Sequence, residues 1–217
     1  FKVPTALLEF MEIMFSGWQR EWEWEQILIT DSVEIPEDAL SITVGSLPYV
    51  LGTLEGTIPQ ISRYTDEPRP IKRVGLAWSG NPAHIDDHHR SIPLELLKPL
   101  FDTDKWFHVV QKDVRYTDEA VFKETGIEAP VFNTVDELSD KIAEMDLIIT
   151  VDTATAHIAG AMGCITWLLL PYHPDWRWGL EKDTTPWYPS IRIFRQGEDR
   201  QWEPVIQRVV EELKCMT

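Results

Sequence analysis

The sequence predicts an α/β protein built on a parallel sheet, and three observations support that fold class. Six short apolar runs follow residue 70, and they are continuous rather than alternating, as expected of strands covered on both faces. Helix-compatible stretches separate most of these runs. The run "DLIITV" leads directly into the small-residue stretch "DTATAHIAGAMG", which is typical of a buried strand followed by a helix. The expected strands cover 73–79, 106–111, 129–134, 146–151, 165–170 and 191–196.

Three stretches between and after the strands are expected to be helices. The first, 91–101, begins with Ser91 as a candidate N-cap and has a proline in its first turn. The second, 134–145, begins with Thr134 followed three residues later by a glutamate, which is capping-box spacing. The third, 202–214, has apolar residues at helical spacing.

The chain divides near residue 66. Residues 1–66 contain one amphipathic helix pattern, one strand pattern and a segment rich in Gly and Pro, which is too little for a full α/β domain. Residues 67–217 carry the strand and helix alternation and form the main predicted domain. The chain begins with Phe1 rather than Met, so we expect a piece of a longer protein.

Composition narrows the classes of function. The 36 acidic residues outnumber the 20 basic ones, for a net charge of −16, and such a surface repels nucleic acids and anionic membranes. The two cysteines lie far apart in sequence, which favours a reducing compartment. No apolar run approaches the roughly 20 residues of a membrane span. The sequence therefore predicts a cytoplasmic protein with no nucleic-acid partner and no transmembrane segment.

The stretch 152–163 has the features of an anion site. Asp152 and Thr153 follow a strand, where ligands of open parallel sheets bind, and Asp152 is expected to be the N-cap. The unpaired N–H groups and the dipole of the helix favour a phosphate. His157 lies about one turn into the helix, within reach of such a phosphate, and Gly163 is the expected stop. The spacing alone leaves an ordinary capped turn with a solvated histidine equally open.

Five segments together resemble the ADP-heptose:lipopolysaccharide heptosyltransferase family, most closely its members at the carboxyl end of tetratricopeptide-repeat proteins. These segments are "VGLAWSGNP", "RSIPLELLKPL", "DLIITVDTATAHIAGAMG", "WLLLPYHPDWRWGL" and "PWYPSIRIFRQ". The resemblance covers residues 70–217 and implies a glycosyltransferase of the GT-B type, with two Rossmann-like domains. It implies that residues 67–217 are the C-terminal, donor-binding domain, preceded by a truncated portion of the N-terminal, acceptor-side domain.

The resemblance also implies which residues contact the nucleotide-sugar. The turn after the fourth predicted strand would hold the diphosphate. The loop after the first strand would lie near the diphosphate, and a basic residue before the next helix would contact it. Residues at the end of the second strand would face the same crevice. The residues at these places are Ser79, Gly80, Asn81, Arg90, Gln111, Lys112, Asp152, Thr153, Ala154 and His157.

The loop "PYHPDWRWGL" (171–180) adds two candidates. Trp176 is placed to stack on a base or sugar, and Asp175 to hold sugar hydroxyls. A packed loop in which Arg177 stacks on a tryptophan is the alternative.

The sequence argues against a metal site and against a nicotinamide-dependent dehydrogenase. The segment "HIDDHHR" (84–90) has histidines and aspartates at short spacing, but we expect a solvated loop and no metal. The turn "GLAWSGNP" lacks the G-x-G-x-x-G pattern, which argues against a nicotinamide dehydrogenase.

The resemblance implies sugar transfer from a nucleotide-diphosphate donor to a glycan, lipid-linked or protein acceptor, with no separate cofactor. The catalytic base is unknown, because most of the acceptor-side domain is missing, and whether this chain is itself an enzyme stays open. A non-catalytic sugar-nucleotide or glycan-binding module, an interaction module and a sugar-nucleotide epimerase are the alternatives. The truncated N-terminal portion also predicts exposed apolar surface that drives homodimer formation.

Overall fold

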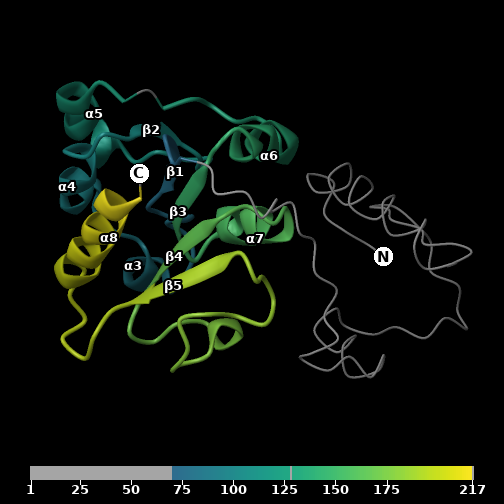
Figure 1. Ribbon diagram of the computed structural model, residues 1–217. Coiled ribbons are helices and arrows are strands. Elements are labelled where there is room, and N and C mark those ends of the chain that lie inside the picture. Colours follow the sequence, from purple (N-terminus) through teal and green to yellow (C-terminus); the bar gives the residue numbers. More distant parts are fainter. Residues whose placement is uncertain (1–69, 128, 217) are drawn as a thin grey trace, which may run out of the picture.

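The computed structural model describes residues 70–127 and 129–216 (Figure 1). The helix and strand expected within residues 1–66, and the proposed boundary near residue 66, lie outside the described residues.

The described part is built on a five-stranded parallel sheet with the order β2-β1-β3-β4-β5. The chain passes from β1 to β2 on one side, then returns to place β3 on the other side of β1. All five residues of β3 are buried, as expected for a central strand covered on both faces. The predicted α/β fold class is therefore confirmed. The strands are β1 Arg73–Ala77, β2 Trp106–Val109, β3 Leu147–Val151, β4 Thr166–Leu170 and β5 Ile191–Arg195.

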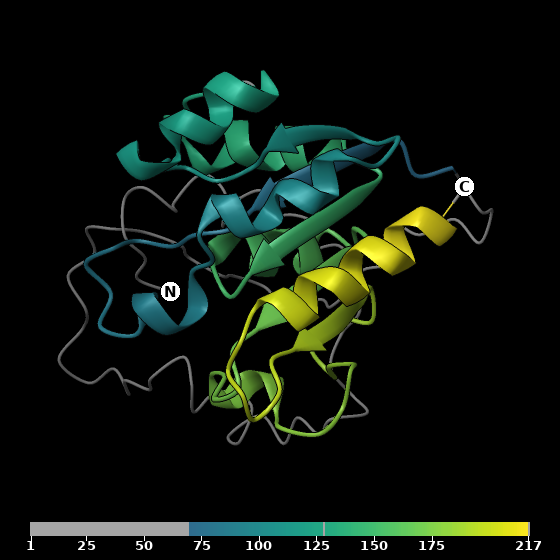
Figure 2. The ribbon, with the colours of Figure 1, turned by 90° about the vertical axis from the view of Figure 1, so that its left-hand side faces the viewer.

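Helices cover both faces of the sheet (Figures 1 and 2). On one face, α4, α5 and α8 pack on side chains such as Leu76 and Ile149. On the other face, α6 and α7 pack on Ile148, the residue next to Ile149, because side chains alternate along a strand. The helices are α3 Asp87–Arg90, α4 Lys98–Phe101, α5 Glu119–Thr125, α6 Val135–Ala143, α7 Ala154–Ala161 and α8 Glu203–Cys215, with short 3-10 turns η4 Leu94–Leu97, η5 Tyr116–Asp118 and η6 Trp176–Trp178.

Five of the six predicted strands are present, and the prediction for 129–134 is wrong. Pro130 cannot donate a ladder hydrogen bond, and the side chain of Val131 is 79% exposed. The backbone N–H of Asn133 donates to the Glu137 carboxylate (2.7 Å) rather than to a strand. Only Phe132 is buried, so this segment anchors the start of α6 instead of extending the sheet.

The helix predictions differ in accuracy at their starts. Thr134 is the N-cap of α6, as predicted, and its Oγ1 accepts a hydrogen bond from the Glu137 backbone N–H (3.1 Å). The helix at the carboxyl end is also confirmed, as α8. Ser91, however, is not the N-cap of the predicted helix 91–101. It ends α3, and the next turn begins at η4 after Pro93.

A segment of the chain lies along the outer edge of β5. Thr184 forms an antiparallel bridge with Arg192, and the Ile193 N–H donates to the Asp183 carbonyl (2.7 Å). The Arg195 guanidinium donates to the carbonyl of Lys182 (2.9 Å). Residues 182–184 therefore occupy hydrogen-bonding groups that an edge strand otherwise leaves open.

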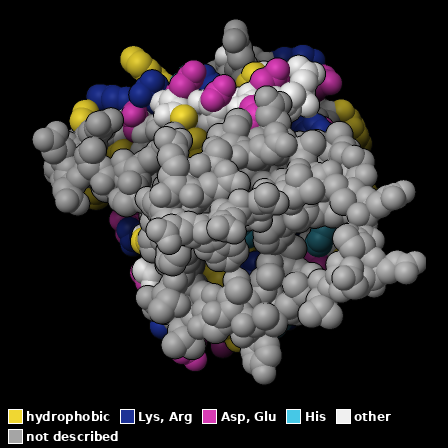
Figure 3. Space-filling model, turned by 90° about the vertical axis from the view of Figure 1, so that its right-hand side faces the viewer, with side chains coloured by type: hydrophobic (Ala, Val, Ile, Leu, Met, Phe, Trp, Pro, Cys, Tyr) yellow, Lys and Arg dark blue, Asp and Glu magenta, His cyan; other side chains and the backbone are white. Residues whose placement is uncertain are grey.

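Along the upper rim of the view in Figure 3, where side chains of the described residues are visible, acidic and basic side chains are interspersed. Exposed ion pairs such as Lys141 with Glu144 (2.8 Å) follow from this pattern. None of the described helices combines the length and the apolar character that crossing a membrane requires.

Candidate functional site

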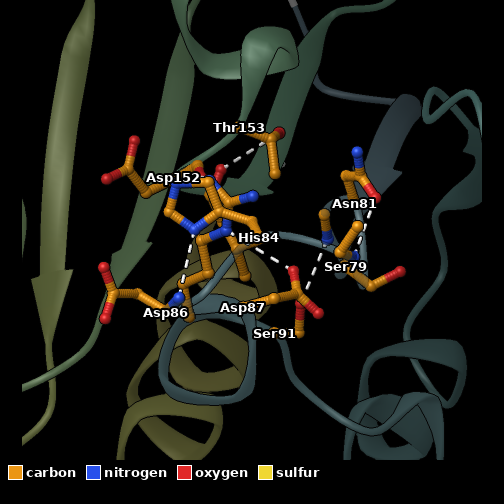
Figure 4. Close-up of polar contacts among 12 residues, drawn as sticks. Ser79, Asn81, His84, Asp86, Asp87, Ser91, Asp152 and Thr153 are labelled. Carbon is orange, nitrogen blue, oxygen red and sulfur yellow. Dashed lines mark hydrogen bonds and ion pairs between the residues drawn. The ribbon is translucent and has the colours of Figure 1, made fainter.

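The strand order places two loops side by side at the carboxyl edge of the sheet. The chain leaves β1 and β3 in opposite lateral directions, and open parallel sheets bind ligands in the crevice that this reversal creates. An open cavity of about 570 Å³ lies there, between α3, the start of α7 and the loop after β4 (Figure 4). Six of the predicted contacts line it: Arg90, Asp152, Thr153, Ala154, His157 and Asp175.

The turn into α7 differs by one residue from the prediction. Thr153, not Asp152, is the N-cap: β3 ends at Val151, α7 begins at Ala154, and the backbone of Thr153 is extended (φ −141°, ψ 177°). The Thr153 side chain makes no capping hydrogen bond to the helix. Its Oγ1 lies 3.4 Å from the carbonyl of Val151, to which it donates. The first turn of α7 therefore has no side-chain cap, and Thr153 and Ala154 both line the cavity.

Arg90 links α3 to the end of β3. One terminal nitrogen of its guanidinium donates to the backbone carbonyl of Asp152 (2.9 Å). Its Nε lies 3.5 Å from the Asp87 carboxylate. Gly80 makes room for this arrangement, because a Cβ there would lie 2.6 Å from the Arg90 guanidinium. A side chain at residue 80 would displace the guanidinium from its partners.

Asp87 holds these parts together, although the sequence analysis expected a solvated loop at 84–90. Its side chain is buried and accepts a hydrogen bond from Ser91 Oγ (2.9 Å) and another from the Arg115 guanidinium. Ser91 Oγ in turn accepts a hydrogen bond from the Gly80 N–H (3.0 Å). Sequence spacing carried no signal for this network, because Arg115 lies 28 residues away along the chain.

Gln111 was predicted to face the ligand crevice, and the structure buries it. The amide oxygen accepts hydrogen bonds from the N–H groups of Trp78 (2.8 Å) and Ser79 (3.1 Å). The amide nitrogen donates to Ser79 Oγ (3.1 Å) and to the Asp113 carbonyl (2.8 Å). Gln111 thus ties the loop after β1 to the end of β2. Lys112 is exposed and does not line the cavity.

His157 sits in an aromatic enclosure. Its Nδ1 lies 3.1 Å from the hydroxyl of Tyr188, and its ring stacks on Trp178 with centroids 5.2 Å apart. The Tyr188 ring rests on Gly160, where a Cβ would lie 2.5 Å from the ring. Tyr188 was not among the predicted contacts, because it comes from a loop 31 residues beyond His157. The aromatic residue next to Tyr188 in the sequence was the one signal that could have indicated this contact.

Burial is the largest influence on the pKa values of the two titratable groups at this turn, Asp152 and His157. Burial lowers the pKa of His157, and the nearby Asp152 carboxylate opposes that change. Burial raises the pKa of Asp152, against the Trp178 indole and His157. The Trp178 indole nitrogen is buried and makes no hydrogen bond of normal geometry, although it lies close enough to act on Asp152. The enclosure therefore favours the neutral form of both groups.

The loop after β4 contains the stacking of Arg177 on a tryptophan that was the alternative expectation for 171–180. Asp175 lines the cavity, and its Oδ1 accepts hydrogen bonds from the backbone N–H (3.0 Å) and guanidinium (2.8 Å) of Arg177. The Arg177 guanidinium lies over the Trp176 ring, 4.7 Å from its centroid. Trp176 is 70% exposed and outside the cavity lining. Asn81 also lies outside it, and its side chain accepts a hydrogen bond from the Ala83 N–H (2.9 Å).

We expect Tyr188→Phe to release the His157 ring. Loss of the hydroxyl removes the partner of Nδ1, which we expect to destabilise the domain by about 0.5–1.5 kcal/mol. The imidazole ¹⁵N resonances of His157 report the tautomer and should shift. Tyr116→Phe removes a hydroxyl from an exposed side chain and is the control. Unchanged His157 resonances in Tyr188→Phe would show that the hydroxyl does not hold the ring.

The described residues contain no group of three or more His, Cys, Asp or Glu side chains arranged to hold a metal ion.

No family model matches the chain. The chain is similar to Protein FlbA of Caulobacter vibrioides, with 30% identity over 156 residues. That match covers 67% of this chain, and the chain spans about a quarter of the relative's length. Among solved structures, it is similar to E. coli heptosyltransferase WaaC with ADP, at 14% identity and a TM-score of 0.45, over 73% of this chain and 47% of that one.

Proposed function

We propose that the described part of the chain binds the diphosphate of a nucleotide-sugar and is the donor-binding half of a glycosyltransferase. The observation that carries this proposal is the cavity at the reversal of strand order, where Arg90, His157 and the N-terminus of α7 converge. The resemblance of the turn "DTATAH" and its flanking segments to the heptosyltransferase family supports the same reaction class.

The chemistry of the site suits a diphosphate. The uncapped first turn of α7 has N–H groups and a positive dipole end, both of which favour an anion. Arg90 adds a permanent positive charge in a protein whose net charge is −16. During glycosyl transfer, negative charge grows on the departing diphosphate, and donors already fixed in place stabilise it most effectively. Arg90 is fixed by Asp152 and Asp87, and His157 by its aromatic enclosure.

The other predicted contacts take different roles in this proposal. Ser79 and Gln111 position the loop after β1 and do not contact the donor with their side chains, because those side chains hydrogen-bond to each other. Gly80 makes space for Arg90, and Asn81 shapes the loop. Lys112 and Trp176 are exposed, and we propose that they contact parts of the donor beyond the diphosphate.

The acceptor side belongs to the same proposal. We propose a glycan, a lipid-linked saccharide or a protein as acceptor, bound by an N-terminal domain of the GT-B type in a longer protein with tetratricopeptide repeats. Nucleotide binding without sugar transfer by the full-length protein would instead favour the non-catalytic binding module. Consumption of the donor with no acceptor present would favour an epimerase or a hydrolase.

Calorimetric titration with nucleoside diphosphates and nucleotide-sugars tests the donor site. We expect one nucleotide class to bind, and His157→Ala to weaken it by about 1–3 kcal/mol, because a donor to the phosphate is lost. His108→Ala removes a histidine outside the cavity lining and is the control. Equal affinity of wild type and His157→Ala would remove His157 from the site. Failure of every nucleotide to bind would contradict the proposed donor site.

A further inference from the structure

A second and larger cavity opens beside the first. It has a volume of about 750 Å³ and lies between the α3–η4 segment, the η5–α5 segment and the turn that leads into α8. The two cavities share His89, Pro171 and His173 in their walls. Apolar side chains such as Ile92 and Val121 line the second cavity. None of the roles proposed for the donor site uses it.

Basic groups gather around this second cavity. It is lined by two arginines and three histidines, against two acidic residues. One of those acids, Asp118, already accepts a hydrogen bond from the Trp78 indole (2.9 Å). The charge of Arg115 is shared with Asp87, but no carboxylate of the described residues pairs with Arg200. In a chain with a net charge of −16, this lining has as many arginines as acidic residues, and three histidine rings add further hydrogen-bonding nitrogens.

Arg200 is held at the cavity by a strained backbone. Its φ of +55° is uncommon for a residue with a side chain, and within the described residues no other non-glycine residue has a positive φ. Buried Gln196 supports this geometry, because its amide donates to the Arg200 carbonyl (2.9 Å) and accepts from the Tyr172 N–H (3.1 Å). The Arg200 guanidinium consequently lies over the Tyr172 ring (5.8 Å) and 3.3 Å from His173 Nε2. Backbone strain of this kind is concentrated at binding sites.

We propose that the second cavity binds a small anionic ligand with an apolar body, that is, an aryl or alkyl phosphate or carboxylate. Arg200 supplies the positive charge, and the histidine ring N–H groups supply further donors for the anion. Ile92, Val121 and the Tyr172 ring supply the surface for the apolar body. The site goes beyond the proposed donor function and does not rest on it, because Arg200 does not line the first cavity.

Titration of the whole chain with phenyl phosphate, followed through the histidine imidazole resonances, tests this site. We expect saturable shifts at His88 and His173. Benzoate distinguishes a carboxylate ligand from a phosphate, and phenol, which lacks the charge, should not bind. Arg200→Asn should weaken binding about tenfold while the fold is kept, because asparagine tolerates a positive φ. Lys123→Gln removes the same charge from an exposed side chain outside both cavities and should leave binding unchanged.

Three results would overturn the proposal. Absence of saturable shifts with both phenyl phosphate and benzoate would show that the cavity binds no such anion. Equal affinities of Arg200→Asn and Lys123→Gln would show that the general charge of the protein, and not this cavity, attracts the ligand. Binding that is lost in His157→Ala but kept in Arg200→Asn would assign the ligand to the first cavity. Circular dichroism of each variant verifies that it is folded.

Discussion

Replacing Asp87 by alanine should destabilise the domain by about 2–4 kcal/mol, because it leaves two arginines without their shared carboxylate. Asp87 is only 5% exposed, so water does not replace the lost partner easily. Ser91 Oγ also loses its acceptor, although it keeps the Gly80 N–H. Because Arg115 is partly exposed, the expected loss of stability is smaller than for a fully buried ion pair.

Urea denaturation of wild type, Asp87→Ala and Asp86→Ala measures this effect. Asp86 is the adjacent residue, and its replacement by alanine changes the net charge by the same amount. Its side chain is exposed and makes no capping hydrogen bond, so its loss leaves no buried partner unpaired. We expect Asp86→Ala to stay within about 0.5 kcal/mol of wild type. Similar losses in both variants would mean that the buried network contributes nothing specific.

Replacing Arg90 by glutamine should weaken diphosphate binding by about 30- to 150-fold, which corresponds to roughly 2–3 kcal/mol. The guanidinium is the positive charge that links α3 to the turn before α7, and glutamine cannot restore it. The Asp152 carbonyl also loses its donor, so the turn that forms the cavity becomes less well fixed. The measurement is calorimetric titration with the nucleotide class that the wild-type chain binds.

Arg192→Gln is the matched control for Arg90→Gln. Arg192 is on β5 and forms an exposed pair with Glu212 of α8 (2.7 Å), outside the cavity. The two variants change the net charge equally, so only a contact in the site should distinguish them. If both bound the diphosphate with the same affinity, Arg90 would have no place in the donor site.

The sequence was most informative where a pattern acts locally. The apolar runs of β1 and β3–β5 and the cap at Thr134 depend on neighbouring residues, and they were predicted correctly. The run at 129–134 failed because four apolar or small residues resemble a buried strand, while Pro130 prevents ladder pairing. At the turn before α7, one residue of additional extended backbone moved the N-cap from Asp152 to Thr153.

Side-chain partners that are distant in sequence were not predictable in this way. Asp87 and Arg115 meet only because the sheet brings α3 next to the loop after β2. Gln111 has the position of a ligand contact at a strand end, yet its amide satisfies backbone groups of the neighbouring loop. Tyr188 reaches His157 because Gly160 has no side chain. Each pairing depends on tertiary contacts that a single sequence does not encode as spacing.

The segment 182–184 has a consequence for the behaviour of the protein at high concentration. An open edge strand is a template on which a second molecule can add a strand, and continued addition leads to aggregates. Here the bridge between Thr184 and Arg192 and the hydrogen bond to Ile193 already occupy the outer edge of β5. Because the chain blocks this edge with its own backbone, growth of intermolecular sheets from β5 first requires the segment to detach.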